Sequence, residues 1–189
     1  MPPLRGAPGL ALANLMMVLM LAACAGLPQA RTPPLLHLSP ASLGRELALV
    51  QRLEIRVGAQ SRTFDVALEI DANELRVVML QFGQTVARLV WDGHQLQQQL
   101  APGWPAVISA AQVLNDLQML WWPTDKIRAV LPAGWALIES AQGRELRHGD
   151  QLVTSLVMVA PGHIELKQFL VGYLLHVHSK DAEPEIAPR

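Results

Sequence analysis

The sequence predicts an α+β fold in which one antiparallel sheet is interrupted midway by two helices. Three observations predict it. Residues 46–100 alternate apolar and polar side chains with a period of two, residues 109–130 repeat apolar side chains at helical spacing, and the alternation resumes over residues 135–178. Turn sequences of a few residues separate the alternating segments, so successive strands are expected to pair antiparallel. We therefore expect about nine to eleven strands, with the helices covering the apolar face of the sheet.

The first half of the sheet is expected to hold five strands. In the first of them Leu53, Ile55 and Val57 share one face and charged residues share the other, which is typical of a strand with one side in water. The link Asp92-Gly93 is a strong hairpin signal. The expected strands are 46–57, 63–70, 75–80, 86–91 and 95–100.

A helical insertion follows the fifth strand. Ser109 is positioned to cap a helix that runs to about Trp122, where Pro123 ends it. Thr124 is positioned to cap a second, shorter helix through Val130. The first helix carries an apolar stripe made of Val113, Leu114, Leu117, Leu120 and Trp121.

The strand pattern returns at Trp135 and continues nearly to the end of the chain. Gly, Pro, Asp and Gln residues separate these segments, and most of them are favoured in tight turns. The second half of the sheet is therefore expected to be another run of neighbouring antiparallel strands. The expected strands are 135–139, 145–147, 152–159, 164–169 and 171–178.

The N-terminus has the character of a secretion signal. Arg5 precedes an uncharged apolar stretch that ends at Ala23 and has about 15 residues, whereas a membrane-spanning helix needs roughly 20. The segment 21–24, Leu-Ala-Ala-Cys, resembles the bacterial lipobox, whose cysteine receives a diacylglyceryl group and becomes the new N-terminus. We expect a signal peptide over residues 1–23 and lipidation of Cys24, the single cysteine. A spanning anchor and an ordinary signal peptide are the alternatives.

Three further segments follow the predicted cleavage site. Residues 24–40 contain four prolines and are expected to form an extended tether, residues 41–180 the folded domain, and residues 181–189 a disordered tail. The chain has 15 Lys and Arg against 16 Asp and Glu, without a basic cluster. Binding of nucleic acid is therefore not expected.

No catalytic motif is visible in the chain. The patterns G-x-S-x-G and H-E-x-x-H and a glycine-rich phosphate loop do not occur, so we expect neither an enzyme nor a cofactor. His176 and His178 lie two apart on a predicted strand and would form a zinc site with His163 or Glu165 if folding brought these together. The preferred interpretation is a solvated edge strand near the C-terminus, without a metal.

The apolar residues are compatible with a ligand cavity between the helices and the sheet, although composition alone favours a solid core in which these side chains interlock. Ligand sites are concave, mostly apolar and sparing of polar groups. Asp116 and Asp125 flank the break between the helices and are expected to be capping or solvent-facing acids rather than an acid–base pair. The residues expected to line the cavity are Ile55, Phe64, Val66, Leu68, Val77, Met79, Leu89, Trp91, Leu117, Leu120 and Trp121.

Four segments of the mature chain resemble a family of small proteobacterial lipoproteins found with aryl-polyene and xanthomonadin pigment genes. They are QVLNDLQMLWWP at 112–123, LPAGW at 131–135, LSPASLG at 38–44 and LQFGQT at 80–85. The resemblance implies a role in pigment assembly at the outer membrane, facing the periplasm. Ala25 after the lipidated cysteine, where aspartate resembles an inner-membrane retention signal, favours the same destination.

The order of lipobox, strands, helices and strands is similar to LolB, the outer-membrane receptor for lipoproteins. This resemblance implies an unclosed antiparallel half-barrel whose helices plug an acyl-binding cavity. It also implies an apolar side chain on a loop that inserts into the membrane, and Phe82 is the matching residue. We expect the protein to bind an acyl or polyenyl lipid, with a periplasmic carrier as its donor. The alternative is a scaffold lipoprotein with a protein partner, and an enzyme of lipid-linked intermediates comes third.

Overall fold

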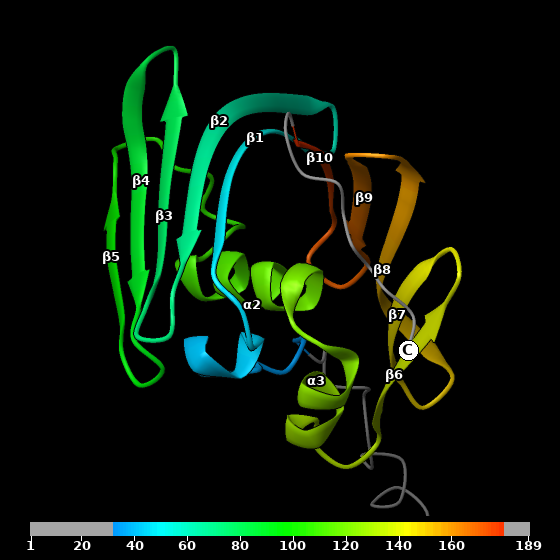
Figure 1. The fold of residues 1–189 in the computed structure, drawn as a ribbon. Helices are drawn as coiled ribbons and strands as arrows, with labels where there is room; N and C mark the ends of the chain where they lie inside the picture. The colour runs from blue at the N-terminus through cyan, green and yellow to red at the C-terminus, as the bar shows by residue number, and fades with distance from the viewer. Residues whose placement is uncertain (1–31, 180–189) are drawn as a thin grey trace, which may run out of the picture. The chain divides into compact units, whose positions relative to one another are not determined.

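The computed structural model describes residues 32–179 of the chain. The predicted signal peptide, the lipidation site Cys24 and the predicted tail 181–189 lie outside the described residues. The described part folds as one sheet with two α-helices on its inner side (Figure 1). In chain order the elements are η1 (Pro40–Leu43), β1 (Leu47–Val57), β2 (Gln60–Ile70), β3 (Leu75–Gln81), β4 (Gln84–Trp91), β5 (Leu96–Leu100), α2 (Ala110–Trp121), α3 (Thr124–Val130), β6 (Trp135–Ser140), β7 (Gly143–His148), β8 (Gln151–Ala160), β9 (His163–Gln168) and β10 (Tyr173–Ser179).

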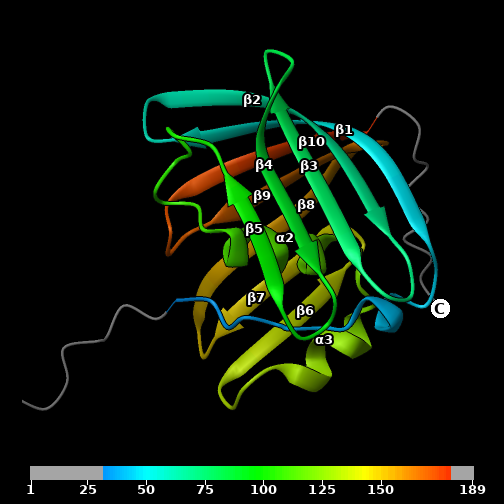
Figure 2. The same ribbon diagram turned by 90° about the vertical axis from the view of Figure 1, so that its left-hand side faces the viewer.

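The ten strands of residues 32–179 follow the order β5-β4-β3-β2-β1-β10-β9-β8-β7-β6. All neighbouring strands are antiparallel. Each half of the chain is a meander, and the two meanders join where β1 pairs with β10, for example at Leu53 opposite Val177. The end strands β5 and β6 are not paired with each other, so the sheet is unclosed (Figure 2). The prediction of an open antiparallel sheet with a helical insertion is confirmed.

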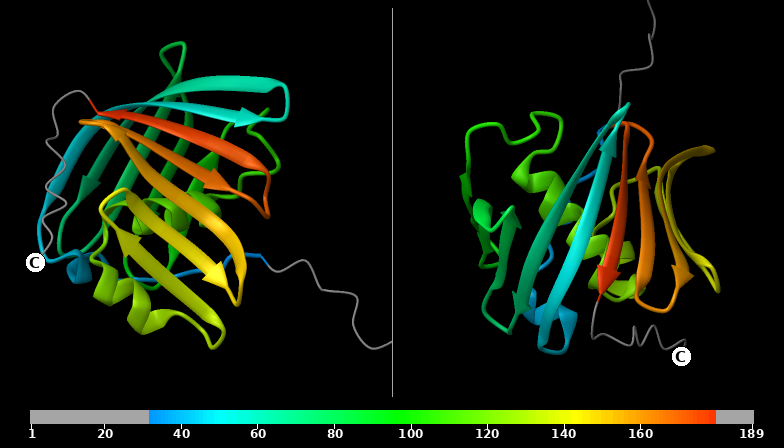
Figure 3. Two further views of the ribbon diagram at one scale, coloured as in Figure 1. Left: turned by 90° about the vertical axis from the view of Figure 1, so that its right-hand side faces the viewer. Right: turned by 90° about the horizontal axis from the view of Figure 1, so that it is seen from above.

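The sheet curves around α2, which lies on its concave side (Figure 3). β2 shows why one face is apolar: Phe64, Val66 and Leu68 are buried, while the alternate residues Asp65 and Glu69 are exposed. Because side chains alternate between the two faces of a strand, every second residue points at the helix. Burial of each such side chain stabilises the fold by roughly 1.5–3 kcal/mol.

The helix boundaries follow local chemistry. Ser109 Oγ accepts a hydrogen bond from the Gln112 backbone N–H at 3.1 Å, which confirms the predicted cap of α2. α2 ends at Trp121, and the next residue, Trp122, is extended with ψ 149°. Pro123 occupies the capping position of α3 without a side-chain bond. The prediction that Thr124 is the cap is therefore wrong, and it is instead the first helical residue.

The predicted boundary between tether and domain at residue 40 is wrong. Leu36, Leu38 and Pro40 are buried. The backbone N–H of Leu36 donates to Asn115 Oδ1 at 3.0 Å. Gln118 accepts from the Leu38 N–H at 3.2 Å and donates to its carbonyl at 2.8 Å. Leu36, Leu38 and Pro40 alternate with exposed residues as in a strand, but the polar side chains of α2, rather than a neighbouring strand, satisfy the backbone of this segment.

Candidate functional site

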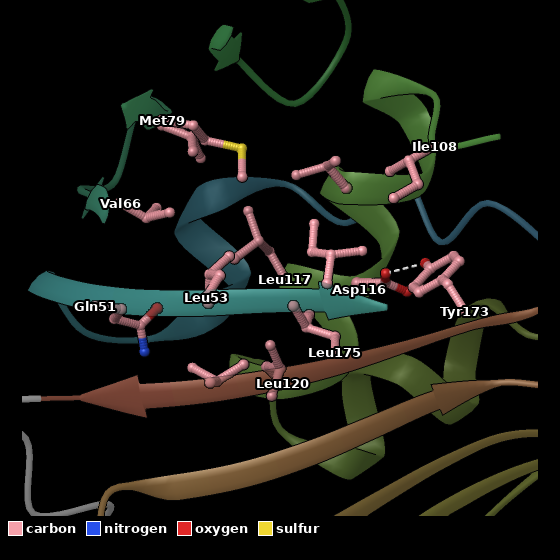
Figure 4. Close-up of a pocket in the computed structure, with 14 residues that line it drawn as sticks. Gln51, Leu53, Val66, Met79, Ile108, Asp116, Leu117, Leu120, Tyr173 and Leu175 are labelled. Carbon is pink, nitrogen blue, oxygen red and sulfur yellow. Dashed lines mark hydrogen bonds between the residues drawn. The ribbon is translucent and has the colours of Figure 1, made fainter. Parts of the chain in front are cut away.

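A cavity lies between α2 and the concave face of the sheet (Figure 4). Its volume is about 30 Å³, and since one water needs roughly 10–15 Å³ it has room for about two. Its wall is apolar except for Gln51, Asp116 and Tyr173. The lining residues are Gln51, Leu53, Ile55, Val66, Val77, Met79, Ile108, Val113, Asp116, Leu117, Leu120, Tyr173, Leu175 and Val177.

Six of the residues predicted to line the cavity do so, and five do not. Ile55, Val66, Val77, Met79, Leu117 and Leu120 face it. Phe64, Leu68, Leu89 and Trp91 are buried elsewhere in the core, and Trp121 is only half-buried. Alternation places all the strand residues on the correct face, but the position of α2 along that face decides which of them border an empty space. The wall contributed by β10 was missed because its neighbour β1 is far away in sequence.

Asp116 is the polar centre of the cavity wall. Tyr173 Oη donates a short hydrogen bond to Asp116 Oδ2. Gln112 Nε2 and Gln168 Nε2 donate to Oδ1 at 2.9 and 2.7 Å. Gln168 in turn accepts from the Thr154 hydroxyl at 2.9 Å. This network joins α2 to β8, β9 and the start of β10.

Burial dominates the ionisation of this network. It raises the pKa of Asp116 from 3.8 to about 6, although Tyr173, Gln168 and Gln112 act in the opposite direction through their hydrogen bonds. Burial and the adjacent carboxylate also raise the pKa of Tyr173, so its hydroxyl remains the proton donor. At neutral pH the site therefore holds a carboxylate, mostly ionised, against an apolar space.

The interpretation of Asp116 as a capping or solvent-facing acid is wrong, because the side chain is 5% exposed. α2 is covered on several sides: the sheet packs on its apolar stripe, residues 36–38 on Asn115 and Gln118, and β9 and β10 on Asp116. A polar residue on an amphipathic helix is normally predicted to face solvent. The sequence alone therefore does not predict that Asp116 is buried. Asp125 is exposed on α3 and lies 3.6 Å from Lys126 Nζ.

A second hollow adjoins the cavity at Ile55, which lines both. It has a volume of about 270 Å³ and is formed by the end of β1, the start of β2 and residues 103–107. Trp104 packs against Phe64 with ring centroids 5.9 Å apart, and Arg62 donates to the Gly103 carbonyl at 2.8 Å. This hollow therefore lies beside the cavity, next to the segment that precedes α2.

The tip of the β3–β4 hairpin is a two-residue turn made of Phe82 and Gly83. Phe82 is 97% exposed and has φ 51°, and Gly83 has φ 75°. Glycine adopts this left-handed conformation readily, but it is unfavourable for a bulky side chain. The predicted insertion residue therefore lies in water with no packing partner, at a position where Asn or Gly is the ordinary choice.

Three histidines gather on the outer face of the sheet. His163 Nε2 lies 3.4 Å from His176 Nδ1, and the rings of His163 and His178 stack at 4.1 Å. Burial and these two neighbours lower the pKa of His163. Within residues 32–179 no group of three or more His, Cys, Asp or Glu side chains is arranged to hold a metal ion. The expectation of an edge strand here is wrong, because β10 pairs with both β1 and β9.

Comparison with known proteins adds the family. No helix in the described part of the chain is long and apolar enough to cross a membrane. No curated protein matches the sequence. The family model for DUF3261, a protein of unknown function, matches residues 48–181, which span both halves of the sheet, both helices and the cavity. The chain therefore belongs to the DUF3261 family.

Proposed function

We propose that this protein is a non-enzymatic, lipid-anchored carrier that holds an acyl or polyenyl chain against its concave sheet and passes it to the outer membrane. The observation that carries the proposal is the apolar cavity beneath α2, inside a sheet whose end strands are not joined. Ligand sites share this concave, apolar character with a few polar groups. The arrangement supports a LolB-like half-barrel in which α2 occupies the ligand's place.

Binding of a long chain would require α2 to move. The cavity of about 30 Å³ admits only a small group, whereas the hollow beside Ile55 is about 270 Å³. A chain would enter at Ile55, beside residues 103–107, and displace the start of α2 outward. Residues 101–109, which lead into α2, contain Pro102, Gly103 and Pro105 and only a few backbone hydrogen bonds. This connection provides a hinge for that movement.

Phe82 supports delivery to a membrane. An exposed aromatic side chain at the end of a hairpin reaches a bilayer before the rest of the domain, and its backbone conformation costs stability that folding alone does not explain. Lipidation at Cys24 would keep the domain at the membrane. The resemblance to pigment-cluster lipoproteins supports a polyenyl cargo, and the resemblance to LolB supports a periplasmic carrier as its donor.

A second candidate is a scaffold lipoprotein that binds a protein partner. The small volume of the cavity favours it, because the side chains around α2 then form a solid core. In that case an apolar probe has no place to bind. The two candidates are separated by one measurement.

That measurement is binding of the fluorescent apolar probe N-phenyl-1-naphthylamine to the mature, unacylated chain, followed by displacement with fatty acids. Leu117→Phe fills the cavity and is expected to weaken probe binding by at least about tenfold, while overpacking costs about 1–3 kcal/mol of stability. Leu137→Phe overpacks a buried position of β6 that does not border the cavity, and it should leave binding unchanged. Probe binding that is absent in the wild type, or equal in both variants, would favour the scaffold.

Delivery is tested with Phe82→Glu in a liposome transfer assay. The substitution should impair transfer while changing stability by less than about 0.5 kcal/mol, as usual for surface positions. Loss of cooperative folding in this variant would remove the insertion role.

The membrane anchor is tested at Cys24. Cys24→Ser should abolish incorporation of a clickable fatty acid and leave a soluble or uncleaved species. Labelled Cys24→Ser protein in the outer-membrane fraction would contradict the lipoprotein interpretation.

A further inference from the structure

The carboxylate of Asp116 is buried without a cation beside it. Its three hydrogen-bond donors, Tyr173, Gln112 and Gln168, are all neutral. No charged side chain of the described residues is among the causes of its pKa shift. A buried carboxylate normally has a cationic partner, because transferring an isolated charge out of water is costly.

The carboxylate retains one free acceptor position. An ionised carboxylate has about four lone-pair sites. Oδ1 accepts from both glutamines, whereas Oδ2 accepts only from Tyr173. Asp116 and Tyr173 both line the cavity, so a donor group placed in that space can approach Oδ2 (Figure 4).

The three hydrogen bonds explain the carboxylate only in part. A neutral asparagine at position 116 has the same size and would accept from Gln112 and Gln168 through Oδ1, but its Nδ2 is a donor and could not accept from the Tyr173 hydroxyl. The carboxylate accepts all three bonds, but it does so as a desolvated charge with no cation to neutralise it. This unneutralised charge beside an empty space points to a cationic ligand.

We infer that this end of the cavity selects an amphiphile with a primary ammonium head, which donates to Asp116 Oδ2 and neutralises its charge. The inference rests on the proposed lipid-binding function and names the head group that the cavity accepts. The head fits the space, because an ammonium nitrogen is comparable in size to water and the cavity has room for about two waters. Carboxylate and phosphate heads are repelled by Asp116 and find no cation at this end.

The test compares three twelve-carbon amphiphiles as competitors of N-phenyl-1-naphthylamine: dodecylamine, dodecanol and dodecanoic acid. At pH 7.5 dodecylamine should displace the probe from the wild type at about a tenfold lower concentration than dodecanol, since a hydrogen bond to a charged group contributes roughly that factor. Dodecanoic acid should be the weakest competitor. In Asp116→Asn the ratio of amine to alcohol should fall to about one. Asp125→Asn removes an exposed acid on α3 and is the matched control, which should keep the wild-type ratio.

A measurement on the wild type alone tests the ammonium site even if Asp116→Asn fails to fold. An alkylammonium stays charged between pH 5 and 7.5, like the lysine side chain. The preference for dodecylamine over dodecanol should therefore decrease several-fold at pH 5, where Asp116 is largely protonated. Within residues 32–179, Tyr173 is the only titratable side chain that hydrogen-bonds to Asp116, and it stays protonated across this range.

The outcomes separate this inference from the function on which it rests. Equal displacement by amine and alcohol in the wild type, or a preference that survives in Asp116→Asn, overturns the ammonium site and leaves lipid binding intact. Failure of the wild type to bind the probe or any competitor overturns the lipid-binding function, and the ammonium site with it.

Discussion

The tip of the β3–β4 hairpin and the middle of α2 each carry a side chain in an unusual environment, and the two cases are opposite. At the tip, Phe82 is an apolar residue with 97% of its surface exposed, and in the core Asp116 is an acid with 5% exposed. In β2 the strand alternation is regular, as Phe64 and Asp65 illustrate. Among the described residues Phe82 is the most exposed large apolar side chain and Asp116 is the only buried acid, which indicates positions kept for something other than stability.

The two cases also differ in cost. A left-handed backbone at a residue with a Cβ costs roughly 1–2 kcal/mol, and at Phe82 nothing in the described structure compensates. The raised pKa of Asp116 corresponds to a cost of about 3 kcal/mol at neutral pH. Three hydrogen bonds already offset part of the desolvation there. The buried Asp116 therefore costs more stability than the strained Phe82, and it alone has hydrogen bonds that offset part of its cost.

The largest expected effect comes from adding a second carboxylate one residue further along α2. Leu117→Asp places a carboxylate in the cavity wall without the donors that surround Asp116, so it should lower the free energy of unfolding by on the order of 4 kcal/mol at pH 7.5. Leu117→Asn has the same size and no charge and should cost clearly less. Urea denaturation of both variants measures the difference. Equal losses of stability in the two variants would show that a buried charge at position 117 adds no cost. The hydrogen-bond donors around Asp116 would then not be needed to stabilise its charge.

A smaller effect is expected from neutralising Asp116 itself. Its pKa is about 6 in the folded protein against an ordinary value of 3.8, so the folded state binds the proton more tightly. Stability from this group is present below pH 3.8 and is lost as the pH rises through 6. Between pH 3.5 and pH 7.5 the stability of Asp116→Asn relative to the wild type should therefore rise by up to about 3 kcal/mol. Denaturation curves at both pH values test this, and a difference independent of pH would show that the carboxylate is not buried as charge.

The smallest effect is expected at the hairpin tip. Phe82→Asn relieves the left-handed strain, because asparagine tolerates this conformation, and should raise stability by about 1 kcal/mol. Ala59→Asn at the tip of the β1–β2 hairpin is the control and should change stability by less than about 0.5 kcal/mol. Thermal melts report stability, and flotation with vesicles reports membrane contact. If the Phe82→Asn variant gains stability and still binds vesicles fully, the aromatic side chain of Phe82 has no role in membrane contact.

The open sheet and its helical insertion could be predicted from the chain because their signals are local. Alternation in β2, the turn at Asp92-Gly93 and the cap at Ser109 each depend on residues a few positions apart. The position of β10 could not be predicted in this way, because its pairing with β1 joins residues at opposite ends of the domain. The packing of residues 36–38 on α2 could not be predicted either. The side-chain amides that bond their backbone belong to Asn115 and Gln118, which lie far away in sequence.

The same distinction applies to the candidate site. Sequence alone determined which strand side chains face inward, that α2 carries an apolar stripe, and that an aromatic residue occupies a tight turn at Phe82. The tertiary structure alone decided where a cavity remains and that Asp116 forms its polar end, with partners from α2, β10 and β9. The physical reason is that periodicity depends on neighbouring residues, whereas desolvation of a carboxylate depends on every element packed around it.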